Sequence, residues 1–173
     1  PTALRRARAA AATAADVADA LCWLHSRGVS HGDLTCSNVL LCSYSPGGEE
    51  EEEGGGFSDR RKFRAKISDF GLACDLSAAA SSPLCSPSLL PPHGTVTHMS
   101  PERLAGGAPS PEADVFSLGC VLWSMLAGSA PWAGVAAPQV VRLVGIEGLS
   151  LPVPPPPDGC AGCAELEAVL GRA

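Results

Sequence analysis

Hydrophobic residues near the start of the chain recur with the period of an α-helix. Val17, Leu21 and Leu24 fall at helical spacing. Alanine, the strongest helix former, occupies most of the positions before and between them. Gly28 follows as a stop signal. This pattern predicts a helix over residues 9–26.

A second and more hydrophobic segment extends from Asp114 to Ala127. It is apolar on nearly every face, which is typical of a helix at the buried centre of a domain. Pro131 is expected to end it. Shorter helices are predicted over residues 139–144 and 164–170, the second because its apolar residues share one helical face.

Between the two long helices the pattern changes to short apolar runs. Such runs flank a loop in VSHGDLTCSNVLL, residues 29–41, and apolar alternation returns in FRAKISDF, residues 63–70. Residues 43–62, rich in Gly and Glu, cannot bury enough apolar surface to order themselves, so we expect a solvated, disordered insert between two strands. Residues 77–92, rich in Ser, Pro and Ala, are expected to form a mobile loop.

Length and charge exclude several classes of function. The 173 residues suffice for one domain with a hydrophobic core. The formal net charge is −6, but Glu49–Glu53 contribute five negative charges, so the rest of the chain carries −1. Binding of nucleic acid by phosphate neutralisation needs a basic surplus, which this sequence lacks. The longest apolar stretch, Leu118–Gly128, is well short of the roughly 20 residues that span a bilayer.

Eight cysteines are present, and several lie in apolar segments, where a free thiol behaves as a small hydrophobe. A reduced protein in the cytoplasm is therefore favoured over a disulfide framework. Cys160-x-x-Cys163 has no partner pair, which argues against a zinc site. The chain begins with Pro1 and its only methionines are Met99 and Met125, so we expect an excerpt of a longer sequence.

Three short signatures occur in a fixed order. HGDL stands at residues 31–34 with Asn38 five residues after its aspartate, DFG follows an apolar run at residues 69–71, and GTVTHMSPE ends at Glu102. The hydrophobic helix that opens at Asp114 comes next. Each signature alone is weak, since an isolated DFG is usually a turn, but this order is difficult to obtain by chance.

In this order the chain resembles the C-terminal lobe of a eukaryotic protein kinase. HGDLTCSN stands where the family has its catalytic loop, SDFG where it has its magnesium-binding turn, and MSPE at the end of its activation segment. The resemblance extends from about residue 9 to the end, apart from the acidic insert. It implies an α+β fold, mainly helical, with a short β-hairpin at the catalytic loop. GTVTHMSPERL and DVFSLGCVLWSMLAG most resemble the tyrosine-kinase-like group, whose members mostly act on Ser and Thr.

The resemblance implies that Asp33 is the catalytic base, and that Asn38 and Asp69 hold Mg²⁺ against the phosphates of ATP. Gly71 completes the turn that carries Asp69. Because Mg²⁺ is hard and keeps several waters, one carboxylate and one amide oxygen suffice together with the phosphates. The three polar side chains are expected to converge on one cavity above the helix that begins at Asp114.

Supporting roles follow from the same resemblance. His31 and Phe70 are expected to pack beneath the site, and Leu40 to lie under the adenine ring. Thr95 resembles the substrate-loop threonine of Ser/Thr kinases. Asp114 resembles the aspartate that fixes the catalytic loop by accepting its backbone N–H groups, with a simple helix N-cap as the alternative.

Four positions depart from the family pattern. Gly32 replaces an arginine that normally pairs with a phosphate on the activation segment, so regulation by such pairing is not implied here. Thr35 replaces a lysine that touches the transferred phosphate, which predicts a lower rate. His98 stands where tyrosine is common, and Ser100 replaces alanine, a conservative change.

The half of a kinase that clamps the nucleotide carries a Gly-rich loop and a strand lysine. This chain has only Lys62 and Lys66, both just ahead of the DFG signature, and no G-x-G-x-x-G, so an N-terminal lobe is expected in upstream sequence. The arginine that pairs with Glu102 in the family would lie beyond Ala173. Because a buried carboxylate without its partner costs about 3–5 kcal/mol, the stretch is expected to be marginally stable alone.

Residues 1–173 are therefore predicted to be a partial kinase domain whose complete protein transfers phosphate from ATP to Ser or Thr of protein substrates. The alternative, favoured by Gly32 and Thr35, is a pseudokinase or interaction module that binds partners without catalysis; a third is a truncated product without function. The prolines at residues 152–157 are expected to connect helices rather than to bind an SH3 domain. Candidate phosphosites are Ser77, Ser81, Ser82, Ser86 and Ser88.

Overall fold

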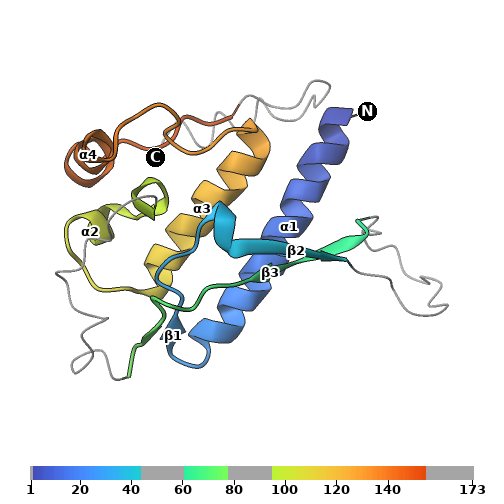
Figure 1. The fold of residues 1–173 in the computed structure, drawn as a ribbon, viewed down its shortest axis with the longest axis horizontal. Helices are drawn as coiled ribbons and strands as arrows, with labels where there is room; N and C mark the ends of the chain where they lie inside the picture. The colour runs from blue at the N-terminus through green and yellow to red at the C-terminus, as the bar shows by residue number, and fades with distance from the viewer. Residues whose placement is uncertain (1, 44–60, 78–94, 155–173) are drawn as a thin grey trace.

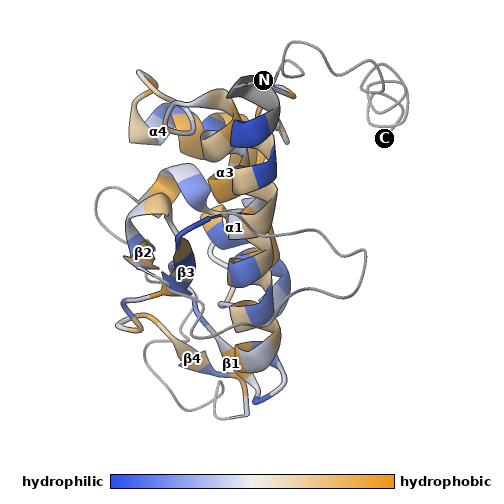
Figure 2. Cartoon of the chain, turned by 90° about the vertical axis from the view of Figure 1, so that its right-hand side faces the viewer, coloured by the Kyte–Doolittle hydropathy of each residue, from blue (hydrophilic) through white to orange (hydrophobic). Residues whose placement is uncertain are grey.

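Two long helices lie side by side and form the framework of the molecule (Figure 1). They are α1 (Thr2–His25) and α3 (Pro111–Ala127), which pack against each other in this computed structural model. The structure describes residues 2–43, 61–77 and 95–154. α1 begins earlier than the sequence pattern predicts because the Ala- and Arg-rich segment before residue 9 is also strongly helix-forming. Figure 2 shows α1 with alternating hydrophilic and hydrophobic patches, as expected of an amphipathic helix.

The ends of α3 differ from the prediction at both termini. The helix starts with Ser110 as N-cap, whose hydroxyl accepts a hydrogen bond from the Ala113 N–H, so Asp114 lies inside the first turns and the N-cap alternative is wrong. Gly128, with φ +71°, is the C-cap, so a left-handed glycine rather than Pro131 ends the helix.

α3 is also not buried on every face. Its buried residues include Asp114, Cys120 and Val121, whereas Val115 is 58% exposed and Leu126 is 43% exposed. The prediction of a helix at the buried centre of the domain therefore holds for only part of the surface of α3. α3 has one face that packs against the core and another face with apolar side chains at the surface.

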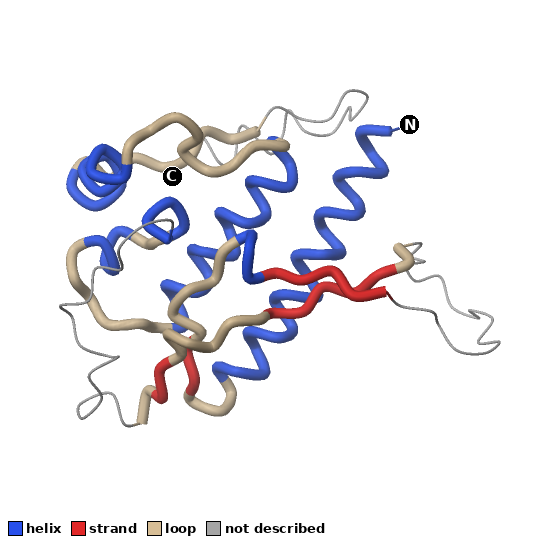
Figure 3. Tube along the Cα trace, viewed as in Figure 1, coloured by secondary structure: helices blue, strands red, loops and turns tan. Residues whose placement is uncertain are grey.

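A short β-hairpin lies across α1 (Figure 3). β2 (Val39–Ser43) pairs in antiparallel register with β3 (Phe63–Ile67), so that Val39 faces Ile67 and Ser43 faces Phe63. The predicted strands on either side of the acidic segment are therefore confirmed and belong to one hairpin. A second antiparallel pair joins β1 (Val29–Ser30) to β4 (Cys74–Asp75).

Asp16 of α1 anchors the hairpin to the helix. Its side chain is only 7% exposed and forms salt bridges with the guanidinium groups of Arg61 and Arg64, each at 3.1 Å. It also accepts the backbone N–H of Ala65 at 3.0 Å. The Arg61 side chain is itself only 7% exposed, so this pair depends on good geometry and hydrogen bonding to offset its desolvation.

Two hydrophobic clusters flank the 31–38 loop. The first joins α1, α3, β3 and the loop itself, and the second joins α3 to the short segments η3 (Thr95–His98), α2 (Pro101–Leu104), α4 (Ala137–Val140) and the π-helix η4 (Val141–Ile146). The predicted helix over residues 139–144 is thus confirmed as α4 with η4. The buried members of the first cluster are Val17, Leu21, Leu24, Leu34, Ala65 and Val121, and those of the second are Val96, Met99, Leu104, Val140 and Val144.

Four of the cysteines in the described residues, Cys22, Cys36, Cys42 and Cys120, are free thiols. Burial raises the pKa of Cys120 to about 12, so this thiol stays protonated and behaves as a small hydrophobe. Cys74 is disulfide-bonded, which departs from the expectation that all cysteines are reduced.

Several predictions fall outside the described residues. They are the disordered state of residues 44–60, the mobile loop after Ser77, the helix over residues 164–170, the Cys160–Cys163 pair and residues 155–157 of the proline-rich connector. At the ends of the predicted disordered insert the prediction is wrong, because Ser43 belongs to β2 and the side chain of Arg61 is buried against Asp16. Within the part that the structure describes, no helix is both long and apolar enough to cross a membrane.

Candidate functional site

Asp114 is the centre of a buried hydrogen-bond cluster that fixes the 31–38 loop. The residue is 2% exposed. Its Oδ2 accepts the backbone N–H of His31 at 2.8 Å and the hydroxyl of Ser30 at 3.0 Å, and its Oδ1 accepts the backbone N–H of Gly32 at 2.9 Å. These donors satisfy most of the carboxylate's hydrogen-bonding capacity and hold the start of the loop against α3.

His25, at the end of α1, also contacts this carboxylate. Its Nε2 lies 2.9 Å from Asp114 Oδ2, so one aspartate ties α1, α3 and the loop together. His25 is a residue of the site that the sequence motifs do not reveal. No local signal marks it, because its partner lies 89 positions further along the chain.

His31 connects the loop to the strand that precedes the DFG turn. The residue is fully buried, and its Nε2 lies 3.1 Å from the backbone carbonyl oxygen of Ser68. Its Nδ1 accepts the backbone N–H of Asp33 at 3.3 Å. The ring of Phe70 packs edge-on against the His31 ring with the centroids 5.1 Å apart, although Phe70 is 49% exposed and so is only partly covered.

Asp33 and Asn38 are joined by a bond across the loop. The Asn38 Nδ2 donates to the backbone carbonyl of Asp33 at 2.8 Å. Because the amide nitrogen is used in this bond, the Asn38 Oδ1 is directed elsewhere and stays available as an oxygen ligand. The Asn38 backbone carbonyl in turn accepts both the N–H and the hydroxyl of Ser68, at 2.9 Å and 3.1 Å.

Asp69 follows directly after this contact. It adopts a left-handed backbone conformation with φ +65°, which is uncommon for a residue with a side chain. Its Oδ1 accepts the Gly71 N–H at 3.2 Å, and Asp69 is exposed at the surface. Strained backbone of this kind often occurs at functional positions. The structure thus connects Asp33, Asn38 and Asp69 through Ser68.

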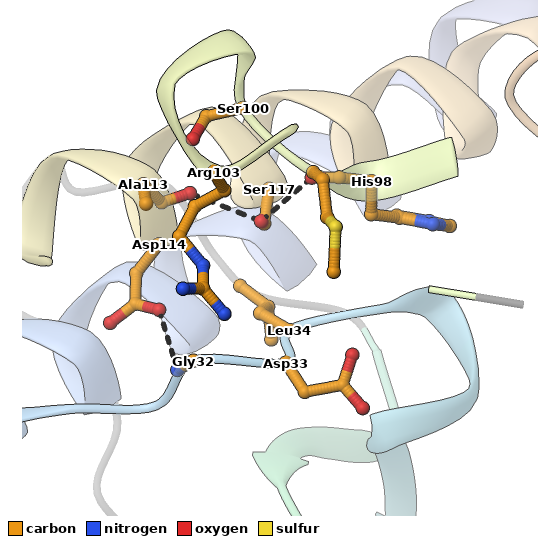
Figure 4. Close-up of a pocket in the computed structure, with 10 residues that line it drawn as sticks. Gly32, Asp33, Leu34, His98, Ser100, Arg103, Ala113, Asp114 and Ser117 are labelled. Carbon is orange, nitrogen blue, oxygen red and sulfur yellow. Dashed lines mark hydrogen bonds between the residues drawn. The ribbon is translucent and has the colours of Figure 1, made fainter. Parts of the chain in front are cut away.

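A small pocket lies between the loop and α3 (Figure 4). It includes Asp33 and Asp114 but neither Asn38 nor Asp69, so the expectation of one cavity shared by the three candidate residues is not met by this pocket. The lining residues are Gly32, Asp33, Leu34, His98, Met99, Ser100, Arg103, Ala113, Asp114 and Ser117.

The remaining predicted positions differ in their surroundings. Leu40 on β2 is 49% exposed, which leaves it open to a ligand or another part of the protein. Glu102 on α2 is exposed, so the expected cost of a buried, unpartnered carboxylate at this position does not arise. The backbone of Thr95 opens η3. Ser100 is 1% exposed, and no group in the described residues accepts or donates a hydrogen bond at its Oγ, so the exchange of alanine for serine here is less conservative than expected.

His98 occupies a buried position beside the loop and was not expected to contact it. Its Nε2 lies 3.4 Å from the Sγ of Cys36, and its Nδ1 lies 3.0 Å from the hydroxyl of Thr97. Its backbone carbonyl accepts the hydroxyl of Ser117 at 2.8 Å, which ties η3 to α3. Burial lowers the pKa of His98 from 6.5 to about 4, so the ring is neutral at pH 7.

This shift predicts acid sensitivity. The unfolded chain protonates its histidine near pH 6.5, whereas the folded protein resists protonation until about pH 4, so stability from His98 is complete above pH 6.5 and is lost as the pH falls towards 4. Urea unfolding of the complete protein at pH 7.5, 6.0 and 5.0 checks this. His98→Tyr is expected to reduce the loss of stability between pH 6.5 and 4. If the free energy of unfolding depends on pH equally in the wild-type protein and in His98→Tyr, the prediction is wrong.

The 31–38 loop carries the carboxylate of Asp33 and the amide oxygen of Asn38, and the neighbouring segment after β3 carries the carboxylate of Asp69. Carboxylate and amide oxygens are ligands that Mg²⁺ prefers. Asp33 lies on a loop whose N–H groups donate to the buried Asp114 of α3, and a carboxylate fixed in this way is suited to accept a proton from a hydroxyl group. The arrangement is therefore chemically suited to phosphoryl transfer.

Comparisons with known proteins agree with this assessment. A family model described as "Protein kinase domain" matches residues 3–148. The "Proto-oncogene serine/threonine-protein kinase mos" of Rattus norvegicus is 34% identical over 127 residues, which cover 73% of this chain and 30% of that protein. The "Serine/threonine-protein kinase PknJ" of Mycobacterium tuberculosis is 35% identical over 159 residues, which cover 91% of this chain and 23% of that protein. The chain spans less than a third of the length of these relatives. It belongs to the protein kinase family, with serine/threonine kinases among its relatives.

Proposed function

We propose that the complete protein containing this chain is a kinase that transfers the γ-phosphate of ATP to Ser or Thr of protein substrates. Both relatives are named as serine/threonine-protein kinases. The observation that carries the proposal is the connected set of Asp33, Asn38 and Asp69, held on Asp114 through the 31–38 loop. Assignment to the tyrosine-kinase-like group and a location in the cytoplasm remain predictions from the sequence.

In the proposed reaction Asp33 orients the attacking hydroxyl and accepts its proton as the bond from the hydroxyl oxygen to the γ-phosphorus forms. The bond from that phosphorus to the bridging oxygen of the β-phosphate breaks, and ADP leaves. The chain's contribution is to hold this carboxylate in a fixed place, which reduces the entropic cost of bringing it to the hydroxyl. The backbone bonds from Asp33 to His31 and Asn38 fix the loop without using the carboxylate itself.

Asn38 and Asp69 would hold Mg²⁺. The donor set suits this ion, because Asn38 directs its amide nitrogen to Asp33 and so leaves Oδ1 for a ligand, while Asp69 is an exposed carboxylate. When bound, the ion would neutralise negative charge on the phosphates. Leu40, exposed on β2, is proposed to lie against the adenine, and Thr95 to contact the substrate.

We further propose that residues 1–173 are the larger lobe of the kinase domain, with the nucleotide-clamping lobe supplied by another part of the complete protein. The sequence supports this, since it contains two lysines and no G-x-G-x-x-G. A pseudokinase is the second candidate, because Gly32 and Thr35 replace an arginine and a lysine of the family pattern.

The test is phosphate transfer from labelled ATP to a library of Ser-, Thr- and Tyr-containing peptides. The complete protein is expected to label Ser or Thr peptides in the presence of Mg²⁺, and residues 1–173 alone are expected to label none. Labelling of Tyr peptides alone, or none by the complete protein while it still binds partners, would favour a different function. Turnover by residues 1–173 alone would contradict the lobe assignment.

A further inference from the structure

Arg103 on α2 points its guanidinium towards the 31–38 loop from the opposite wall of the pocket (Figure 4). It lies in that pocket with Gly32, Asp33 and Asp114. Arg103 is partly buried, and its position places a cation beside two carboxylates of the candidate site. The sequence pattern gave no reason to single out this residue.

Burial and the nearby carboxylates act in opposite directions on the pKa of Arg103, and burial has the larger effect. Burial lowers the pKa of Arg103, while the carboxylates of Asp114, Asp33 and Glu102 raise it. An arginine stays protonated under such conditions. Arg103 shares the pocket with two of these carboxylates, Asp33 and Asp114.

No side chain at position 32 can supply this charge with the present backbone. Gly32 has φ +75°, and a Cβ added there would lie 2.4 Å from the backbone oxygen of Leu72. A residue larger than glycine would therefore clash with backbone, which cannot move aside as the end of a flexible side chain can. The arginine in the pocket lining is Arg103 instead.

A hydrogen bond to the backbone after α2 fixes the guanidinium of Arg103. Its Nη1 donates to the backbone carbonyl of Gly107 at 2.6 Å. Gly107 is itself packed tightly, since its N–H donates to the Glu102 carbonyl at 2.7 Å and an added Cβ would lie 2.7 Å from that oxygen. This short loop therefore limits the movement of the arginine, which is the kind of support that fixes a functional side chain.

We propose that Arg103 is a positioning residue that supplies, from α2, the positive charge that Gly32 does not carry, and that it holds the 31–38 loop in place so that Asp33 meets the substrate hydroxyl. This inference rests on the proposed kinase function. The role of Arg103 differs from those proposed for Asp33, Asn38 and Asp69, because Arg103 neither accepts the proton nor binds the metal ion.

The kinetic test compares Arg103→Gln and Arg103→Lys in the complete protein. Arg103→Gln is expected to lower kcat about tenfold with the KM values for ATP and peptide within about twofold, because the loop is misplaced while binding surfaces remain. Arg103→Lys, which keeps the charge, is expected to recover most of the loss. Arg142→Gln is the matched control, since Arg142 is 63% exposed and pairs with Glu147 away from the loop. An unchanged kcat in Arg103→Gln would overturn the proposal. An equal loss of kcat in Arg103→Gln and Arg103→Lys would also overturn it.

A second measurement does not depend on activity. Hydrogen exchange at the His31 and Gly32 N–H groups, which donate to Asp114, is expected to be faster in Arg103→Gln than in the wild-type protein and unchanged in Arg142→Gln. Arg103→Met, which also removes the charge, is used if the glutamine variant does not fold. Absence of phosphate transfer in the wild-type protein would overturn the proposed function, whereas unchanged exchange in the charge-removing variants would overturn the role of Arg103.

Discussion

Replacement of Asp33 by alanine or asparagine is expected to lower kcat for phosphate transfer by about 10²–10⁴-fold in the complete protein. The carboxylate is the proposed acceptor of the hydroxyl proton, and neither replacement can accept that proton at neutral pH. The measurement is steady-state transfer from ATP to the best peptide of the library, with thermal unfolding of each variant as a check on folding.

The structure makes this experiment informative. The bonds from Asp33 to His31 and from Asn38 to Asp33 use the backbone N–H and carbonyl of Asp33, so Asp33→Asn retains both. The control is Asp19→Asn, because Asp19 is exposed on α1, away from the loop. Wild-type activity in Asp33→Asn, with normal folding, would contradict the assignment of Asp33 as the base. A loss of similar size in Asp19→Asn would show that the assay reports stability instead.

The two long helices and the hairpin were predictable because each carries its own local pattern, whereas the short α2 was not predicted. The spacing of Val17, Leu21 and Leu24 predicts α1, and the short apolar runs around residues 29–41 and 63–70 predict the strands. Boundaries were less accurate. Ser110 is the N-cap of α3, and a serine followed by Pro111 is a start signal that the prediction passed over in favour of Asp114.

The candidate site was predictable only as far as motifs define it. The spacing of the signatures led to Asp33, Asn38 and Asp69. The structure relates them through Ser68, to which the sequence assigned no role. Contacts between residues that are distant in the sequence could not be predicted from motifs. His25 and Arg103 face the loop from helices that are separate in sequence, and such long-range packing depends on the whole fold.

The exposed state of Glu102 shows a second limit of sequence reasoning. The expectation that this carboxylate is buried comes from the family resemblance, since nothing in the local sequence reports its burial. Burial depends on which elements cover a surface, and residues beyond 154 are not described. Instability expected from Glu102 therefore has no support in this structure, whereas the buried polar group that does matter is Asp114.

Asp114→Ala is expected to destabilise the complete protein by about 3–5 kcal/mol and to abolish phosphate transfer. The substitution removes the acceptor of hydrogen bonds from Ser30, His31 and Gly32, and it leaves these donors buried beside a cavity. It also removes the partner of His25, so α1 loses its tie to the loop. Since domains are stable by only about 5–15 kcal/mol, a loss of this size is measurable as a lower denaturant midpoint in urea unfolding.

Asp114→Asn separates the loss of the hydrogen-bond acceptor from the cavity that alanine leaves. It preserves the size of the side chain, but its amide nitrogen faces at least one of the donors, so a loss of stability smaller than that of the alanine variant is expected. Asp19→Ala is the surface control and is expected to change the free energy of unfolding by no more than about 0.5 kcal/mol. If Asp114→Ala unfolds at the same urea concentration as this control, the carboxylate does not hold the loop. The catalytic geometry proposed for Asp33 would then lack its support on α3.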